Sequence, residues 1–215
     1  KGNPEGASNM VNRLHNIYKQ HLPLLYTNEE TTNRVRERLD NIFLQLHEFR
    51  TREFSEADEK AILAQGEIMS TNMVTEYLKE CGVKAILLPA LDYMRLDSNG
   101  EPDLPYIRER LSYLLEKNPD NDIYITQGFI CRNAEGQIDN LQRGGSDYTA
   151  SLIGAAIRAS EIQIWTDIDG MHNNDPRFVE GTTPVRQLSF EEAAELAYFG
   201  AKILLPTPSN HYSTF

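Results

Sequence analysis

The sequence predicts an α/β fold with a mainly parallel sheet, and three observations lead to this prediction. Short apolar runs of the kind that form buried strands alternate along the chain with longer segments whose apolar residues recur at helical spacing. The order helix, strand, helix, strand is typical of parallel strands connected by helices. The 215 residues are 40% hydrophobic and 25% charged, which is the composition of a globular protein with a sizeable core.

The first quarter of the chain is predicted to be helical. Between residues 9 and 52 the apolar residues recur at helical spacing, which predicts two amphipathic helices with a break near Leu22-Pro23. Thr27 and Glu30 have the Thr-x-x-Glu spacing of a capping box, so we expect them to start the second helix. The charged side chains of this segment are expected to form a solvated face; they are Arg34, Arg36, Glu37 and Arg38.

The remaining elements follow in alternation. A third helical region is expected over residues 56–78, with an interruption near Gly66 and an end at Gly82, a residue that favours helix C-termini. Ser189 and Glu192 form a second capping-box pattern. The predicted strands cover residues 84–89, 122–126 and 162–165, and the predicted helices cover residues 106–117, 150–159 and 189–199.

Composition excludes several classes of protein. The formal net charge of −11, from 21 basic and 32 acidic residues, gives no general electrostatic reason to bind nucleic acid or an anionic membrane. No apolar run reaches the length of a membrane span. Cys81 and Cys131 form no disulfide framework and no glycosylation sequon occurs, so the cytoplasm is the expected compartment. The chain starts with neither a signal peptide nor a methionine, so we expect a trimmed chain.

The most informative stretch begins at Arg143. This residue and two glycines, Gly144 and Gly145, precede Ser146, Asp147 and a predicted helix of small residues. Free backbone N–H groups at a helix start can bind an anion, and an arginine can hold a carboxylate with two hydrogen bonds. The Asp147 carboxylate can order a nearby lysine or a metal ion. The alternative is a plain Gly-Gly turn in which Ser146 or Asp147 is the N-cap.

A second candidate stretch follows the predicted strand 162–165, where ligands of open α/β sheets usually bind. Arg177 can reach a nucleotide phosphate, and Thr166 and Asp167 can contact a base or ribose. His172 has no second histidine or cysteine at ligand spacing, so we expect a loop residue that is hydrogen-bonded or faces solvent. No metal site is predicted from the residues of this stretch.

Two further charged residues are candidates for the site. Glu67 follows Gly66 and is expected to open a helix, where it either neutralises the helix dipole or binds a substrate ammonium group. Lys202 follows the helix predicted to end near Gly200, and its ammonium group is either solvated or stabilises a transferring phosphoryl group. The sequence has no motif of a Walker-type NTPase, a Rossmann dehydrogenase, a zincin or a serine hydrolase.

Together these stretches resemble the aspartate kinase branch of the amino acid kinase family. The resemblance runs in order from about residue 56 to residue 206. It rests on five motifs, which are Gln65-Gly66-Glu67-Ile68-Met69-Ser70, Thr126-Gln127-Gly128-Phe129-Ile130, Arg143-Gly144-Gly145-Ser146-Asp147-Tyr148-Thr149-Ala150, Trp165-Thr166-Asp167-Ile168-Asp169-Gly170 with Asp175-Pro176-Arg177, and Phe199-Gly200-Ala201-Lys202-Ile203-Leu204.

The resemblance implies a three-layer αβα sandwich and an ATP-dependent kinase. It implies transfer of the γ-phosphoryl group of ATP to the β-carboxylate of L-aspartate, which gives 4-phospho-L-aspartate, the first step toward lysine, threonine and methionine. Residues 1–215 would form an incomplete catalytic domain, and the complete protein would be a homo-oligomer. Residues 1–135 would make up the substrate-side lobe, including the helical segment 9–52, and residues 140–215 the ATP-side lobe.

The resemblance also implies a role for each candidate residue. Lys202 and Asp147 would be catalytic, with Lys202 and Mg²⁺ offsetting phosphate charge and Asp147 orienting lysine side chains. Glu67 would bind the aspartate ammonium group. The carboxylates of aspartate and the wall of its pocket would be contacted by Phe129, Arg143, Gly144, Gly145 and Ser146. ATP would be held by Thr166, Asp167, His172, Arg177, Lys202 and Ile203.

Two departures from the family pattern shape the alternatives. Family members begin with a strand and a Lys-Phe-Gly-Gly-Thr-Ser loop that binds ATP phosphates, and this sequence has no such segment. We therefore expect the chain as it stands to be inactive. His172 stands where many members have a tyrosine, and we expect imidazole to be tolerated there. The alternatives are a sibling kinase that acts on another carboxylate and a non-catalytic nucleotide-binding paralogue.

Overall fold

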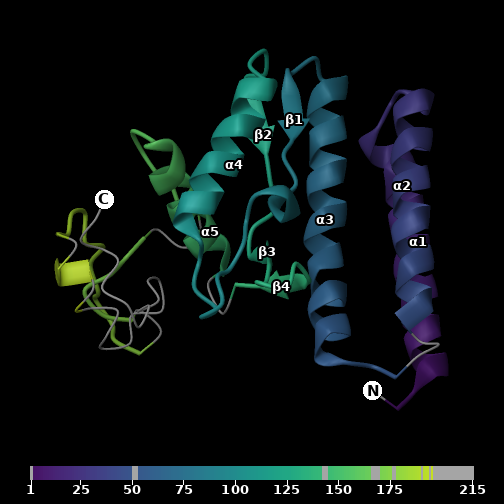
Figure 1. Cartoon of the computed structure of the whole chain (residues 1–215), viewed down its shortest axis with the longest axis horizontal. Coiled ribbons are helices and arrows are strands. Elements are labelled where there is room, and N and C mark those ends of the chain that lie inside the picture. Colours follow the sequence, from purple (N-terminus) through teal and green to yellow (C-terminus); the bar gives the residue numbers. More distant parts are fainter. Residues whose placement is uncertain are drawn as a thin grey trace.

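The computed structural model describes residues 2–49, 53–141, 145–165, 170–175, 178–189, 191–193 and 195. Its elements follow one another as helices and short strands, coloured along the chain in Figure 1. In chain order they are α1 (Pro4–Leu25), α2 (Glu29–Glu48), α3 (Glu56–Glu80), β1 (Ala85–Leu87), the 3₁₀ turn η2 (Ala90–Asp92), α4 (Leu104–Lys117), β2 (Ile123–Ile125), β3 (Ile130–Arg132), β4 (Ile138–Asn140) and α5 (Gly145–Ile157).

The two predicted helices are present as α1 and α2 and pack on each other as a hairpin, but the predicted Thr27–Glu30 capping box is wrong. Helix α1 continues past Pro23 to Leu25, and the N-cap of α2 is Asn28, whose side chain accepts hydrogen bonds from the backbone N–H groups of Glu30 and Thr31. The backbone N and hydroxyl of Thr27 instead both donate to the Glu80 carboxylate on α3, at 2.6 and 2.7 Å. Asn28 is therefore the N-cap of α2, and Thr27 is hydrogen-bonded to Glu80 instead.

A small core of its own joins this hairpin to α3. The charged face of α2 is exposed at Arg34, Glu37 and Arg38, as expected. Arg34 and Arg38 also reach Glu76 on α3, with N–O distances of 2.8 and 3.6 Å. Only 3% of the Glu76 side chain is exposed, so these ion pairs fasten α2 to α3. The buried apolar residues between the helices are Leu22, Tyr26, Val35, Leu39, Phe43 and Met69.

Helix α3 is continuous, so the predicted interruption near Gly66 is wrong. Ser55 and Asp58 form a capping box at its start, and it runs through Gly66 to Glu80. Gly82, with φ +81°, follows its end as expected. A single glycine lowers helix stability by only about 1 kcal/mol, which capping and packing outweigh. Glu67 therefore lies in the middle of a helix and does not open one.

Within the described residues, the strands form two small sheets. β1 and β2 pair in parallel, with Ala85 opposite Ile123, and α4 connects them as predicted. β3 and β4 pair as an antiparallel hairpin that the sequence analysis did not predict. Residues 162–165 form no strand among the described residues, which corrects the third predicted strand. They lie exposed in an extended segment, with Trp165 88% exposed, and an apolar run becomes a strand only where it pairs.

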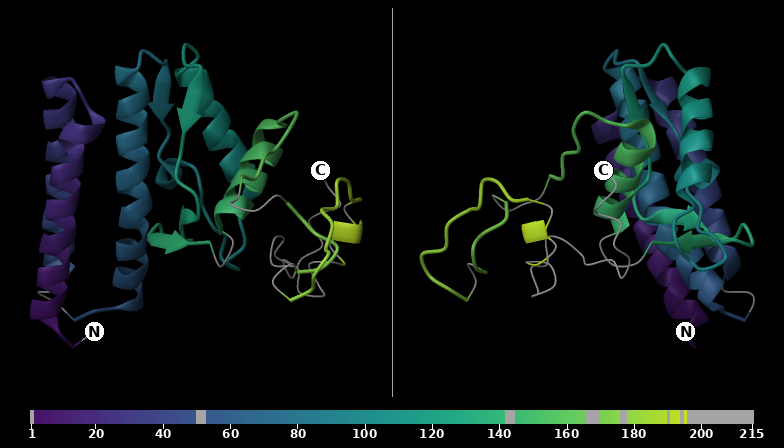
Figure 2. Two further views of the ribbon diagram at one scale, coloured as in Figure 1. Left: turned by 180° about the vertical axis from the view of Figure 1, so that it is seen from behind. Right: turned by 60° about the vertical axis from the view of Figure 1, so that its left-hand side comes forward.

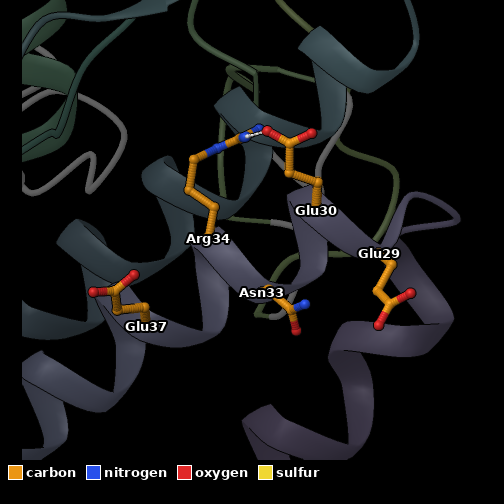
Figure 3. A pocket seen from close by; sticks show the side chains of 5 residues that line it. All are labelled: Glu29, Glu30, Asn33, Arg34 and Glu37. Carbon is orange, nitrogen blue, oxygen red and sulfur yellow. Dashed lines mark ion pairs between the residues drawn. The ribbon is translucent and has the colours of Figure 1, made fainter.

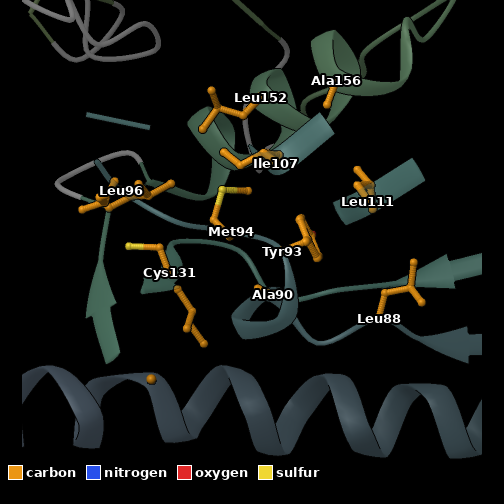
Figure 4. Close-up of a cluster of buried hydrophobic side chains, with 13 residues drawn as sticks. Leu88, Ala90, Tyr93, Met94, Leu96, Ile107, Leu111, Cys131, Leu152 and Ala156 are labelled. Atoms are coloured by element: carbon orange, nitrogen blue, oxygen red, sulfur yellow. The ribbon is translucent and has the colours of Figure 1, made fainter. Parts of the chain in front are cut away.

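The main core lies between the sheet and its helices. Helix α3 lies along one side of the β1–β2 pair and α4 along the other, with α5 packed on α4 (Figures 1 and 2). Helix α5 starts at Gly145, five residues earlier than predicted. The larger buried side chains of this core are Leu88, Tyr93, Met94, Leu96, Ile107, Leu111, Ile130, Leu141 and Leu152. Figure 4 shows the cluster from close by. No helix in the described part of the chain has the length and apolarity needed to span a membrane.

Candidate functional site

A tight turn follows β2 and is centred on Phe129. The backbone N of Ile130 donates to the carbonyl of Gly128 at 2.7 Å, and Phe129 between them has φ +51°. A three-residue turn with positive φ at its centre is rare and strained for a residue with a side chain. The Phe129 backbone is held from two directions, since its N donates to the Thr149 hydroxyl at 3.0 Å and its carbonyl accepts from Leu141 N at 2.7 Å. Strain that the surroundings maintain is typical of functional sites.

The first turn of α5 lies directly against the Phe129 turn. A Cβ placed on Gly145 would be 2.7 Å from Cβ of Phe129, and a Cβ placed on Gly128 would be 2.7 Å from Oγ of Ser146. Both distances are too short for any other residue, so glycine is required at both positions by close approach. The Thr149 hydroxyl also donates to the Gly145 carbonyl at 2.6 Å. Thus Thr149 links the turn to the start of the helix.

The start of α5 can bind an anion. Its first backbone N–H groups have no partner within the helix, and the helix dipole places partial positive charge there. Ser146 and Asp147, in this first turn, both have exposed side chains. Gly145 is buried, so its backbone and not a side chain meets the Phe129 turn. Arg143 and Gly144 lie outside the described residues.

Glu67, on α3, is connected to this region by hydrogen bonds. Its side chain is half-buried, and its carboxylate has no hydrogen-bond partner among the residues that the structure describes. Its backbone carbonyl accepts a hydrogen bond from the Thr71 hydroxyl at 2.8 Å, one turn further along the helix. The Thr71 hydroxyl in turn accepts from Nε2 of Gln127 at 2.8 Å. A series of hydrogen bonds therefore joins the α3 turn that contains Glu67 to Gln127, the residue that precedes Gly128.

A second, partly buried polar contact fixes the end of β2. The hydroxyl groups of Tyr93 and Thr126 are 2.8 Å apart. Burial raises the pKa of Tyr93 to about 12, and the hydrogen bond with Thr126 acts in the opposite direction. The phenol is therefore neutral at physiological pH and serves as a hydrogen-bonding group. Together with Gln127, it holds the backbone that leads into the Phe129 turn.

The residues expected to hold ATP are described only in part. His172 is half-buried, and its Nδ1 lies 3.0 Å from the Thr182 hydroxyl, so the expectation of a hydrogen-bonded loop residue is confirmed. The segment around it lies beyond α5, on the side away from α3 (Figure 2). The described residues contain no group of three or more acidic, histidine or cysteine side chains that could hold a metal ion. The other expected ATP ligands lie outside the described residues; they are Thr166, Asp167, Arg177, Lys202 and Ile203.

An open hollow elsewhere on the surface is not part of this site. It has a volume of about 540 Å³ and is lined by α2 alone, with Arg34 paired to Glu30 at 3.7 Å (Figure 3). Helix α2, which lines it, lies on the opposite side of α3 from β3 (Figure 1). Its lining is the charged, solvent-facing side of one amphipathic helix. Glu37 lies on this side, and the sequence analysis expected it on a solvated face.

Two residues of the site had no role in the sequence analysis. Thr149 and Gln127 both stand within motifs that were recognised, but neither has a local signal for its contacts. Thr149 bonds to a residue 20 positions away and Gln127 to one 56 positions away. Partners at such separations depend on the tertiary fold and cannot be found from spacing in one sequence.

Comparison with known proteins identifies the family. The model of the amino acid kinase family matches residues 6–207. Lysine-sensitive aspartokinase 3 of Escherichia coli K12 is 39% identical over 148 residues, which cover 67% of this chain and 33% of that protein. The aspartokinase of Chlamydia muridarum is 37% identical over 150 residues, or 68% of this chain and 34% of that protein. The chain thus spans about a third of the length of these curated relatives.

Solved structures agree with this assignment. The crystal structure of E. coli aspartokinase III in complex with aspartate and ADP, in the R-state, is similar with a TM-score of 0.76 and 35% identity, covering 91% of this chain and 44% of that one. The T-state structure of the same enzyme with lysine and aspartate gives a TM-score of 0.68 and 36% identity, covering 81% of this chain and 41% of that one. The fold, the motifs and the family match lead to one conclusion: the chain belongs to the amino acid kinase family.

Proposed function

We propose that the protein carrying this chain is an aspartate kinase, which transfers the γ-phosphoryl group of ATP to the β-carboxylate of L-aspartate. The observation that carries the proposal is the likeness, over 91% of the chain, to an aspartokinase structure that contains aspartate and ADP. The relatives at 37–39% identity that bear the name aspartokinase support the same activity. The product would be the acyl phosphate 4-phospho-L-aspartate.

The amino acid substrate is proposed to lie between α3 and the start of α5. Glu67 would bind the ammonium group, which suits a half-buried carboxylate with no partner among the described residues. Arg143 and the backbone around Ser146 would bind the carboxylates, because a helix N-terminus favours anions. Phe129 would line the pocket, where its strained turn meets Gly145.

Phosphoryl transfer requires positioning and charge neutralisation more than a covalent group on the enzyme. We propose that Lys202 and Arg177 neutralise the phosphates of ATP, while Thr166, Asp167 and His172 hold the nucleoside. Mg²⁺ is usually held by one or two carboxylates together with substrate phosphates, and bound in this way it would supply further positive charge. Asp147, an exposed carboxylate in the first turn of α5, would orient the lysine side chains that contact the phosphates.

The test uses the full-length protein with MgATP and hydroxylamine, which traps acyl phosphates as hydroxamates. Parallel reactions contain aspartate, glutamate or no amino acid. We expect hydroxamate with aspartate alone. Hydroxamate with glutamate instead would assign a sibling kinase, and no hydroxamate from a protein that still binds MgATP would assign a non-catalytic paralogue.

A further inference from the structure

Gln127 is a buried polar side chain for which the proposed reaction has no role. It is 3% exposed and lies two residues beyond the end of β2. Its Oε1 accepts a hydrogen bond from the backbone N of Ala90 at 2.7 Å, and its Nε2 donates to the Thr71 hydroxyl at 2.8 Å. Because a backbone N–H can only donate, Oε1 must face Ala90, and this fixes which way the amide points.

The direction of the amide fixes the direction of the whole chain of hydrogen bonds. The Thr71 oxygen accepts from Gln127, so its single proton is available to the carbonyl of Glu67, which at 2.8 Å is nearer than the carbonyl of Ile68 at 3.3 Å. The bonds therefore run from amide to hydroxyl to carbonyl and end on the residue proposed to bind the substrate ammonium group. Buried polar networks in which each member is satisfied hold a unique arrangement of the elements they join.

The backbone of Gln127 leads directly into the Phe129 turn. The next two residues are Gly128, in close approach to Ser146, and Phe129, in the strained conformation against Gly145. Gln127 is thus covalently attached to the turn that contacts the start of α5. Through Thr71 it is hydrogen-bonded to the α3 turn that carries Glu67.

We propose that Gln127 is a positioning residue that sets the separation between Glu67 and the first turn of α5. The inference rests on the proposed function, in which these two places bind the ammonium group and the carboxylates of one small amino acid. A separation error of about 1 Å between binding groups can lower rates on the order of 10²-fold. Fixing that separation with a buried amide between the two elements adjusts the site to the length of its substrate.

The test compares Gln127→Met, which keeps the length of the side chain, with Thr71→Val and Thr71→Ser in the full-length protein. We expect Gln127→Met and Thr71→Val each to raise the KM for aspartate about tenfold and to leave the KM for MgATP within about twofold. Thr71→Ser keeps the hydroxyl and is expected to retain the wild-type value. The double variant should show no more than the larger single effect, because both changes break one chain. Gln137→Met, at an exposed position in the β3–β4 turn, is the matched control.

A purely structural role would give a different result. Lower thermal stability with both KM values unchanged, or both values raised together, would overturn the proposal. Thr71→Val keeps the test available if Gln127→Met fails to fold.

A second measurement separates this inference from the proposed function, because it does not depend on activity. The Phe129 amide is bonded to Thr149 and not to Gln127, so its hydrogen exchange reports movement of the turn itself. We expect exchange about tenfold faster in Gln127→Met and Thr71→Val than in Gln137→Met. Unchanged exchange in both variants would overturn the positioning role, whereas a wild-type protein that makes no hydroxamate with aspartate would overturn only the proposed function.

Discussion

The hydroxyl of Thr149 holds the backbone of Phe129 in a conformation that a residue with a side chain rarely adopts. The Phe129 N donates to the buried Thr149 hydroxyl at 3.0 Å, and φ of Phe129 is +51°. The same hydroxyl donates to the Gly145 carbonyl at 2.6 Å. A helix residue thus links the candidate substrate turn to the helix start that faces it.

Replacing Thr149 with valine removes this link while keeping the shape of the side chain. The Phe129 N–H would lose its partner, so we expect a loss of about 1–3 kcal/mol in the free energy of unfolding. Urea denaturation measures it, and Thr149→Ser, which keeps the hydroxyl, is the control. Equal losses in the valine and serine variants would show that the methyl group matters and the hydroxyl does not.

Gly145 is required by close packing and Gly66 is not. A Cβ on Gly145 would lie 2.7 Å from Cβ of Phe129, so we expect Gly145→Ala to destabilise the fold by about 1–3 kcal/mol. A Cβ on Gly66, within α3, meets nothing within 4 Å, so Gly66→Ala should stabilise it by about 0.5–1 kcal/mol. Thermal denaturation of the two variants shows whether each is less or more stable than the wild type. A stabilising Gly145→Ala would contradict the close approach of the Phe129 turn to α5.

Most helices of this fold could be predicted from the sequence because their apolar spacing is local information. The errors have physical causes. Gly66 indicates a helix break only where nothing else stabilises the helix, and α3 is capped by Ser55 and packed on both sides. The break between α1 and α2 was placed too early because α1 continues past Pro23 to Leu25. The N-cap of α2 was assigned wrongly because Thr27 is bound by Glu80, a residue of another helix.

The strands and the site were predicted less completely. The β3–β4 hairpin has strands of only three residues, too short for a clear alternation, although Gly136 in its turn is a signal that could have been used. Ser146, Asp147 and Phe129 were predicted from motifs, and the structure places the first two in the first turn of α5 and Phe129 against Gly145, where that helix starts. Their supports, Gln127 and Thr149, depend on contacts between distant elements and could not be predicted.

Glu76 makes the docking of α2 on α3 depend on pH. Burial alone would raise the pKa of Glu76, but hydrogen bonds from Lys79 and Arg34 outweigh it and hold the pKa below its ordinary value of 4.5. Since the pKa is lower in the folded state, the stability from these bonds is complete above pH 4.5 and is lost as the pH falls through the folded-state value.

The Glu76→Gln variant lacks this contribution. We expect it to be less stable than the wild type by about 1–3 kcal/mol at neutral pH, and we expect the difference to shrink below about pH 4.5. Urea denaturation at several pH values measures the difference, and Glu37→Gln on the exposed side of α2 is the control. A difference that stays constant into the acid range would show that the Glu76 charge does not contribute.

The assignment of Glu67 to the substrate ammonium group predicts a selective kinetic effect. Removing a contact made equally in the ground state and the transition state raises KM and leaves kcat unchanged. We expect Glu67→Ala to raise the KM for aspartate by roughly 10- to 100-fold, since the lost bond joins two charged groups, with the KM for MgATP unchanged. Steady-state kinetics measures both, and Glu109→Ala on the exposed side of α4 is the control. A change in the KM for MgATP alone would remove Glu67 from the amino acid site.

The measurement that tests the proposed function most directly is identification of the trapped product. The full-length protein is incubated with MgATP, L-aspartate and hydroxylamine, and the hydroxamate is separated by chromatography against authentic α- and β-aspartyl hydroxamates. The account predicts the β-aspartyl hydroxamate, formed in equal amount with ADP. The α-aspartyl hydroxamate, or no hydroxamate at all, would contradict it.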